Sequence, residues 1–393
     1  MRIEPYEQDK RLILQRYQRT CAVCDAQGTV DVAHLCEDAT LRVAASDKLI
    51  LLCPTCNQAQ ARAHYESAAG LPGSFDPAVL EAQGRVRYRE GNFPLSYAKA
   101  RLAAYLFETN KGYSEAVGCL IEAISAIRPL RWGDWLARTA MEVERLCTQH
   151  GPDVGPGLRW LFLDRLALVL YDYSRWAESV AVLLASMSIS NCVQNNPYNP
   201  RQRESDRANS FRRQSLIKAS TRKLDTGERV PKVLSNLNES AEEFLRLGQY
   251  DAFATTLDVA RKIALEVAGD FEKAHGYSER VLSEENKITH KWVLQEHIAS
   301  EAGYFYSKKD FPKAREYMCR AMVLHSKHPV VLEPVLTTDG PKRHDIHEDL
   351  RRIGIGYETL LVEGITIAPS IPEVPLALRT SDVRRIVRSV MST

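Results

Sequence analysis

The sequence predicts a mostly α-helical protein that begins with a small domain of a different kind. Two Cys-x-x-Cys pairs lie close together near the N-terminus. From about residue 94, apolar residues recur with the period of about 3.6 that is typical of amphipathic helices. The chain is 45% hydrophobic and 26% charged, which is the composition of an ordinary globular protein.

The length of 393 residues allows two or three domains. We expect residues 1–90 to form the small domain and residues 91–340 to form helical repeats, interrupted by a basic insertion at 191–232. Residues 341–393 would form a C-terminal helical tail. No apolar run approaches the roughly 20 residues of a membrane span, and the segment MRIEPYEQDK lacks the apolar core of a secretory signal. We therefore expect a cytoplasmic protein with reduced thiols and no membrane partner.

The first cysteine pair is Cys21 and Cys24, and the second is Cys53 and Cys56. A Cys-x-x-Cys turn directs two thiolates at one ion, and two such turns complete a tetrahedral site of the kind that holds structural zinc. The gap between the pairs exceeds the roughly 15–20 residues usual in zinc ribbons, so it must contain structure such as a hairpin. Four unrelated buried cysteines and a thioredoxin-like redox pair are the alternatives, and no βαβ pattern surrounds either pair.

Three segments contain the cysteine pairs or lie between them: RTCAVC at 19–24, VAHL at 32–35 and KLILLCPTCN at 48–57. Together they resemble the HNH nuclease family over residues 8–65. The resemblance implies a ββα-metal domain in the order cysteine pair, strand ending in histidine, apolar strand, cysteine pair and helix. Zinc in such a closed site would supply folding free energy to a domain with a small core.

Phosphodiester hydrolysis needs a base that activates water and a divalent cation that stabilises the developing charge. By resemblance, His34 takes the place of the family's general base, and Asn57 helps to hold Mg²⁺ or Mn²⁺. The family's middle asparagine, which orients the base, aligns with Lys48, or with Asp47 after a shift of one residue. Ala33 occupies a position where many members carry a metal-binding aspartate. The replacement metal ligands near these positions are Asp31, Glu37, Asp38 and His64.

The helical region resembles tetratricopeptide repeats and therefore predicts an α-solenoid over residues 94–330. Several helices share a signature in which an aromatic residue is followed by small or apolar residues at fixed spacings, so that paired helices can approach closely. An ordinary helical bundle is the alternative. The signature positions are Tyr113, Ala116, Leu120 and Ala123; Trp176, Ser179, Leu183 and Ser186; Tyr250, Phe253, Leu257 and Ala260; and Phe311, Ala314, Tyr317, Met318 and Ala321.

The insertion is strongly basic, because residues 201–232 contain ten Lys or Arg and four Asp or Glu, a net charge of +6. Arginine-rich segments suit contacts with nucleic-acid phosphates, although a solvated loop or a charged helix face has the same composition. We predict nucleic-acid contacts, with DNA as the first expectation, at Arg201, Arg203, Arg207, Arg212, Arg213, Arg222 and Lys223.

A final helix follows the prolines of APSIPEVP and combines an apolar side with a basic side. We expect it to dock on the last repeat or on a partner. Ile386, Val387 and Val390 form the apolar side, and Arg384, Arg385 and Arg388 form the basic side.

Together these features predict a metal-dependent HNH-type endonuclease that is tethered or regulated by a tetratricopeptide-like scaffold. The scaffold would bind a partner protein, a second copy of the chain or a regulatory ligand. Such fusions resemble bacterial conflict systems, including anti-phage defence, in which a nuclease stays inactive until a sensor is triggered. The alternative is a non-catalytic adaptor whose zinc module and repeats assemble a protein or protein–DNA complex, a reading that Lys48 and Ala33 favour. A regulator that senses peptides or signals is a third reading.

Overall fold

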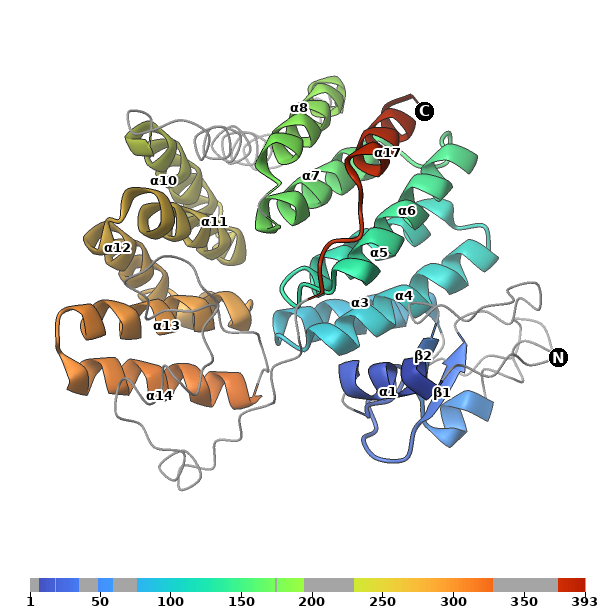
Figure 1. Cartoon of the computed structure of the whole chain (residues 1–393), viewed down its shortest axis with the longest axis horizontal. Coiled ribbons are helices and arrows are strands. Elements are labelled where there is room, and N and C mark those ends of the chain that lie inside the picture. The colour runs from blue at the N-terminus through green and yellow to red at the C-terminus, as the bar shows by residue number, and fades with distance from the viewer. Residues whose placement is uncertain are drawn as a thin grey trace. The chain divides into compact units, whose positions relative to one another are not determined.

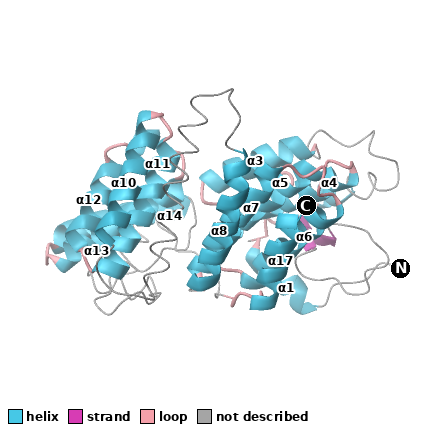
Figure 2. Ribbon diagram, turned by 90° about the horizontal axis from the view of Figure 1, so that it is seen from above, coloured by secondary structure: helices cyan, strands magenta, loops and turns pink. Residues whose placement is uncertain are grey.

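The computed structural model describes residues 7–17, 19–34, 49–58, 76–173, 175–193, 230–327 and 374–392. The described chain is mostly helical, as the sequence predicted (Figure 1). Its strands form one small two-stranded sheet near the N-terminus, drawn in magenta in Figure 2.

The chain divides into two compact units. The first contains Met1–Tyr88, Asn92–Val169 and Ile371–Thr393, and the second contains Arg89–Gly91 and Leu170–Ser370. The main division therefore falls within a helix near residue 170, whereas the sequence suggested a boundary near residue 90. The physical reason is that the cysteine-bearing segment forms ion pairs with residues 87 and 99, so it packs together with the helices that follow it.

The elements of the first unit are α1 (Glu7–Arg16), β1 (Asp31–His34), β2 (Leu49–Leu52), α3 (Pro77–Arg89), α4 (Phe93–Thr109), α5 (Tyr113–Ile127), α6 (Gly133–Gln149), α7 (Pro156–Asp172) and α17 (Thr380–Ser392). Helix α7 runs across the division. The second unit contains α8 (Trp176–Val193), α10 (Val230–Arg246), α11 (Tyr250–Ile263), the π-helix η4 (Ala264–Ala268), α12 (Phe271–Leu282), the 3₁₀-helix η5 (Glu285–Lys287), α13 (Lys291–Ser307) and α14 (Phe311–Lys327).

Strands β1 and β2 pair antiparallel, which confirms the hairpin expected between the cysteine pairs. Asp31 lies opposite Leu52, and His34 lies opposite Leu49. All four residues of β2 are fully buried, which explains why this strand is a continuous apolar run rather than an alternating one. Helix α1 contacts both strands, so the hairpin is covered by the chain that precedes the first cysteine pair.

The same turn recurs between successive helices. Lys111, Gly248 and Lys309 each adopt a left-handed backbone conformation, with φ of 62°, 70° and 61°. The next residue donates its N–H to a carbonyl five positions earlier, as from Gly112 to Phe107, and thereby caps the preceding helix. An aromatic residue then starts the next helix, as Tyr113 starts α5. The turns before α4, α8, α11 and α14 have the same hydrogen bond across five positions, and each is followed by an aromatic residue.

The small and apolar positions of the repeat signature are buried where the structure describes them. Ala116, Leu120 and Ala123 are at most 1% exposed. The corresponding residues of the other helices are similarly buried: Ser179, Leu183, Ser186, Phe253, Leu257, Ala260, Ala314, Met318 and Ala321. These positions therefore face the interior of the helical units.

The C-terminal helix α17 docks on α6 in the first unit, and not on the last helix pair that the sequence suggested. Val383, Ile386 and Val390 are buried in this interface. The segment before the helix also forms a parallel bridge between Val374 and Trp132, with the Gly133 N–H donating to the Val374 carbonyl at 3.1 Å. The buried apolar side chains of α17 and the backbone hydrogen bond of the preceding segment thus fix the docking position together.

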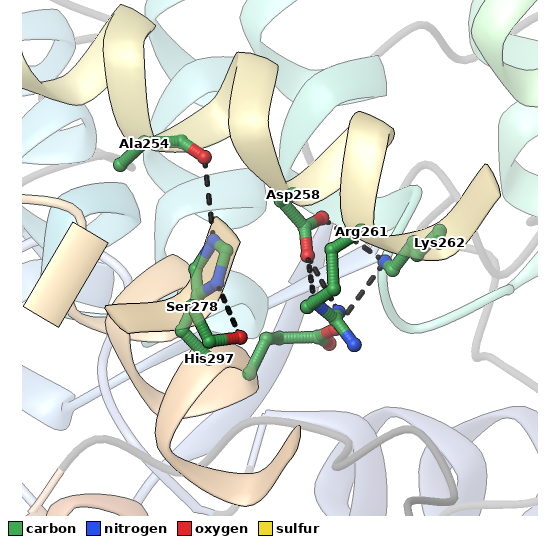
Figure 3. Close-up of polar contacts among 7 residues, drawn as sticks. Ala254, Asp258, Arg261, Lys262, Ser278 and His297 are labelled. Carbon is green, nitrogen blue, oxygen red and sulfur yellow. Dashed lines mark hydrogen bonds and ion pairs between the residues drawn. The ribbon is translucent and has the colours of Figure 1, made fainter. Parts of the chain in front are cut away.

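The second unit contains a buried charged cluster between α11 and α13, defined by Asp258, Arg261, Lys262 and Glu296 (Figure 3). The guanidinium of Arg261 lies 2.6 Å from Asp258 and 3.2 Å from Glu296. Burial by itself would raise the pKa of Asp258, but the charges of Lys262 and Arg261 outweigh it and hold that pKa well below its usual value. Two acids and two bases therefore balance their charges inside this unit.

His297 lies beside this cluster and is fully buried. Its Nε2 lies 3.4 Å from the Ala254 carbonyl oxygen, which can only accept, and its Nδ1 lies 3.2 Å from the Ser278 hydroxyl (Figure 3). These contacts suit a neutral ring that donates from Nε2 and accepts at Nδ1. Burial lowers the pKa of His297 to about 3, and the charge of Arg261 acts in the same direction.

We expect Gly133→Ala to displace the C-terminal segment, because a Cβ at this position would overlap the backbone of Pro375. The substitution should reduce stability by about 1–3 kcal/mol and expose residues 374–392 to proteolysis. Thermal unfolding and limited proteolysis measure both effects. Gly157→Ala is the matched control, because no atom lies within 4 Å of a Cβ at that position. Equal behaviour of the two variants would contradict the close-approach explanation.

We expect acidification to destabilise the second unit through His297. Because its pKa is lowered in the folded state, the unfolded chain binds more protons between about pH 3 and the ordinary pKa of 6.5. The contribution of His297 to the free energy of unfolding should therefore fall by about 1.4 kcal/mol per pH unit as the pH drops through this window. Burial raises the pKa of Glu301 to about 8, so Glu301 acts in the opposite direction, and the effect of His297 is measured as a difference between two proteins. In urea unfolding at pH 7 and pH 5, with hydrogen exchange to assign the transition to α13, the wild type should lose more stability on acidification than His297→Gln. Parallel profiles would exclude His297 as the cause.

Candidate metal centre

The four cysteines predicted from the sequence come together in the first unit. The Sγ atoms of Cys21, Cys24, Cys53 and Cys56 all lie within 4.8 Å of one another. All four are free thiols. Within the described residues, no other group of three or more His, Cys, Asp or Glu side chains is arranged to hold a metal ion.

The first pair lies in a tight loop whose backbone is closed by hydrogen bonds. The Cys21 N–H donates to the Ala26 carbonyl at 2.9 Å, and the Asp25 N–H donates to the Cys21 carbonyl at 3.1 Å. Asp25 adopts a left-handed conformation with φ of 62°, which lets the chain reverse directly after Cys24. The Ala22 N–H donates to the Leu51 carbonyl at 2.8 Å, and this hydrogen bond holds the loop against β2.

The second pair lies where β2 ends and a short helix begins at residues 54–58. Pro54 starts this helix, a position where a proline loses no hydrogen bond. The Cys56 N–H faces the Cys53 sulfur at 3.5 Å, and the Asn57 N–H donates to the Cys53 carbonyl at 2.9 Å. Both thiols therefore face the first pair from the start of a helix.

The sulfur geometry fits a tetrahedral zinc ion. Zn–S bonds of about 2.3 Å place the corners of a regular tetrahedron roughly 3.8 Å apart. The sulfur atoms of Cys24 and Cys53 are 3.7 Å apart, whereas a disulfide would require about 2.05 Å. Four thiolates with no open coordination position are the donor set of a structural site.

The protonation behaviour of the thiols follows from their crowding. Burial raises the pKa of Cys24, and it raises the pKa of Cys56 further with the help of negative charge on Cys21. The pKa of Cys53 is lowered, because the Cys56 N–H and neighbouring thiols stabilise its thiolate more than burial opposes it. A divalent cation bound between the sulfur atoms would favour the thiolate forms of these crowded thiols.

Asp25 anchors the first cysteine loop to the helices that follow. Its carboxylate lies 2.7 Å from the Lys99 ammonium of α4 and 2.6 Å from the Arg87 guanidinium of α3. Lys99 also donates to the Val23 carbonyl at 2.8 Å and to the Gln83 side chain at 2.9 Å. Two elements of the helical region therefore hold a loop that precedes them by more than 60 residues.

A second anchor joins α1 to α6. Arg16 is 2% exposed, and its guanidinium lies 3.2 Å from the Asp134 carboxylate. It also packs over the rings of Trp132 and Trp135, at 4.7 and 4.3 Å from their centroids. A buried arginine between two indoles combines cation–π attraction with an ion pair, so the helix before Cys21 is fixed in position.

Only some of the residues predicted to take part in catalysis fall within the part of the chain that the structure describes. His34 is the last residue of β1, and Asn57 is half-buried in the short helix at residues 54–58, directly after Cys56. Asp31 opens β1 and is exposed. The other predicted active-site positions lie outside the described residues: Glu37, Asp38, Asp47, Lys48 and His64. The same holds for the nucleic-acid residues Arg201, Arg203, Arg207, Arg212, Arg213, Arg222 and Lys223.

The sequence reasoning missed Asp25 and Lys99. Lys99 lies in a segment of α4, residues 93–104, that is buried throughout. A lysine in a helix without an exposed face must find partners inside the protein, and that signal was readable from the run FPLSYAKARLAAYL. The identity of its partners was not readable, because they lie far away in the chain.

Neither a protein-family model nor a curated protein matches the sequence of this chain. Within the described residues, no helix combines the length and apolar character that a bilayer crossing requires. The metal centre therefore rests on the geometry of the four cysteines.

We expect the purified chain to contain about one zinc ion and the double variant Cys53→Ser/Cys56→Ser to contain none, because two thiolates cannot complete a tetrahedral site. Elemental analysis by mass spectrometry measures the metal content. Cys319→Ser, in the second unit, is the control and should keep its zinc. Equal zinc in the double variant and the wild type would exclude this centre as the binding site.

Proposed function

We propose that the chain is a metal-dependent HNH-type nuclease that cleaves nucleic-acid phosphodiester bonds and is tethered or regulated by a tetratricopeptide-like helical scaffold. The observation that carries the proposal is the order of elements around the four cysteines. Between residues 21 and 58 lie, in order, a cysteine loop, a strand ending in His34, an antiparallel partner strand and a second cysteine pair whose Cys56 belongs to a short helix. This order is similar to that of a ββα-metal domain.

In this proposal the zinc ion is structural, because four cysteines leave it no open position for substrate. The chemistry would be supplied by a second ion, Mg²⁺ or Mn²⁺, which stabilises negative charge on the phosphate when bound. Asn57 would help to hold that ion from the short helix at residues 54–58. His34 would take the proton from the attacking water at the end of β1.

The helical scaffold would present the nuclease to its target or hold it inactive. The repeated capping turns and the buried signature residues support tetratricopeptide-like units. The basic segment 201–232 supports a nucleic-acid target, with DNA as the first candidate. A role in bacterial anti-phage defence is the biological setting in which a nuclease and a sensor scaffold are useful in one chain.

The alternative function is a non-catalytic adaptor. Its supporting observation is the tight connection between the cysteine loop and α3 and α4, which makes the metal centre an integral part of a helical unit. A zinc module used in this way would shape a binding surface for protein or DNA.

We expect the purified chain to nick supercoiled plasmid in the presence of Mg²⁺ or Mn²⁺, and His34→Ala and Asn57→Ala to reduce the rate at least about 100-fold. Gel electrophoresis measures nicking, and elemental analysis of each variant checks that zinc is retained. Gln58→Ala is the matched control, because Gln58 is the exposed neighbour of Asn57 on the same helix.

Equal nicking by the wild type and His34→Ala would assign the cleavage to a contaminant. No nicking of DNA or RNA by the zinc-loaded wild type with either metal would reject the nuclease proposal and favour the adaptor.

A further inference from the structure

Lys99 is completely buried in α4, yet its side chain bears an ammonium group. Its three contacts are the Val23 carbonyl at 2.8 Å, the Asp25 carboxylate at 2.7 Å and the Gln83 side chain at 2.9 Å. The contacts with Val23 and Gln83 are hydrogen bonds, and the contact with Asp25 is an ion pair.

Two of these contacts fall on the first cysteine loop. Val23 lies between Cys21 and Cys24, and Asp25 directly follows Cys24. If the loop moved away, the ion pair with Asp25 would break and the buried ammonium would lose two of its three named contacts, which is costly for a charge inside the protein.

The charges around the loop also favour a role for Lys99 at the metal centre. A zinc ion with four thiolates has a net charge of −2. Asp25 places a negative charge on the loop, and Lys99 and Arg87 each bring a positive charge to it from the helices that follow. A methionine could fill the space of Lys99 without any desolvation cost, so core stability alone does not explain a lysine here.

We propose that Lys99 is a positioning residue of the metal centre: from α4 it holds the first cysteine loop in its metal-binding conformation and offsets the negative charge of a tetrathiolate-bound divalent cation. The ion class is a thiophilic divalent metal such as Zn²⁺, for which Co²⁺ is a spectroscopic substitute. The inference rests on the metal centre and is independent of nuclease activity.

The test compares Lys99→Met with Arg101→Met in the full chain. Arg101 is a matched control, because it is a buried cation on the same helix whose ion pair, at 2.6 Å, goes to Glu142 of α6 and not to the cysteine loop. The Co²⁺ absorption spectrum reports tetrathiolate geometry, and competition against a chromophoric chelator gives the zinc affinity.

We expect Lys99→Met to weaken zinc binding about 10–100-fold and to alter the sulfur-to-cobalt charge-transfer bands, because groups that orient metal ligands have effects of this size. Lys99→Arg, which keeps the charge, should recover part of the affinity. Arg101→Met should keep the wild-type spectrum and affinity even where its thermal stability falls.

Arg87→Gln provides a milder variant if Lys99→Met does not fold, because Arg87 is at the partly exposed edge of the same ion pair. It should shift the affinity in the same direction by a smaller factor. Wild-type affinity and spectrum in Lys99→Met, or in Arg87→Gln where that is the folded variant, would overturn the proposal. Equal losses in Lys99→Met and Arg101→Met would also overturn it, and a wild-type chain that binds neither metal would overturn the metal centre itself.

Discussion

Four sulfur atoms within 4.8 Å of one another impose the main constraint on the first unit. Thiolates at this spacing repel one another, and burial of Cys56 makes its ionisation still harder. A divalent cation bound between the thiolates attracts all four of them. The same side chains that would otherwise repel one another then hold the two cysteine pairs together. The hairpin, the short helix after Cys53 and the loop after Cys21 all meet at this point, and their arrangement depends on it.

The metal centre is also part of the helical protein. Asp25 connects its first loop to α3 and α4, and Arg16 connects the preceding helix to α6. The residue before Asp134 is Gly133, where the C-terminal segment makes its close approach. One continuous set of contacts thus joins the N-terminal hairpin, the central helices and α17, although the two ends of the chain are more than 300 residues apart.

The two units solve the problem of buried charge in different ways. In the second unit, Asp258, Arg261, Lys262 and Glu296 balance one another within a closed cluster. In the first unit, Lys99 and Arg87 share the carboxylate of Asp25. Asp25 directly follows Cys24, which is why we connect this contact in the first unit with an ion bound nearby.

The sequence by itself determined what depends on local spacing. The Cys-x-x-Cys pairs indicated a four-sulfur centre, the gap between them indicated a hairpin, and positions such as Ala116 and Leu120 were assigned correctly to helix contacts, because short spacings fix which side chains share a loop or a face. Only the tertiary structure decided that Asp25 pairs with Lys99, that α17 docks on α6 and that the chain divides near residue 170. These contacts join residues far apart in the chain, and no local pattern specifies which of many buried surfaces will meet.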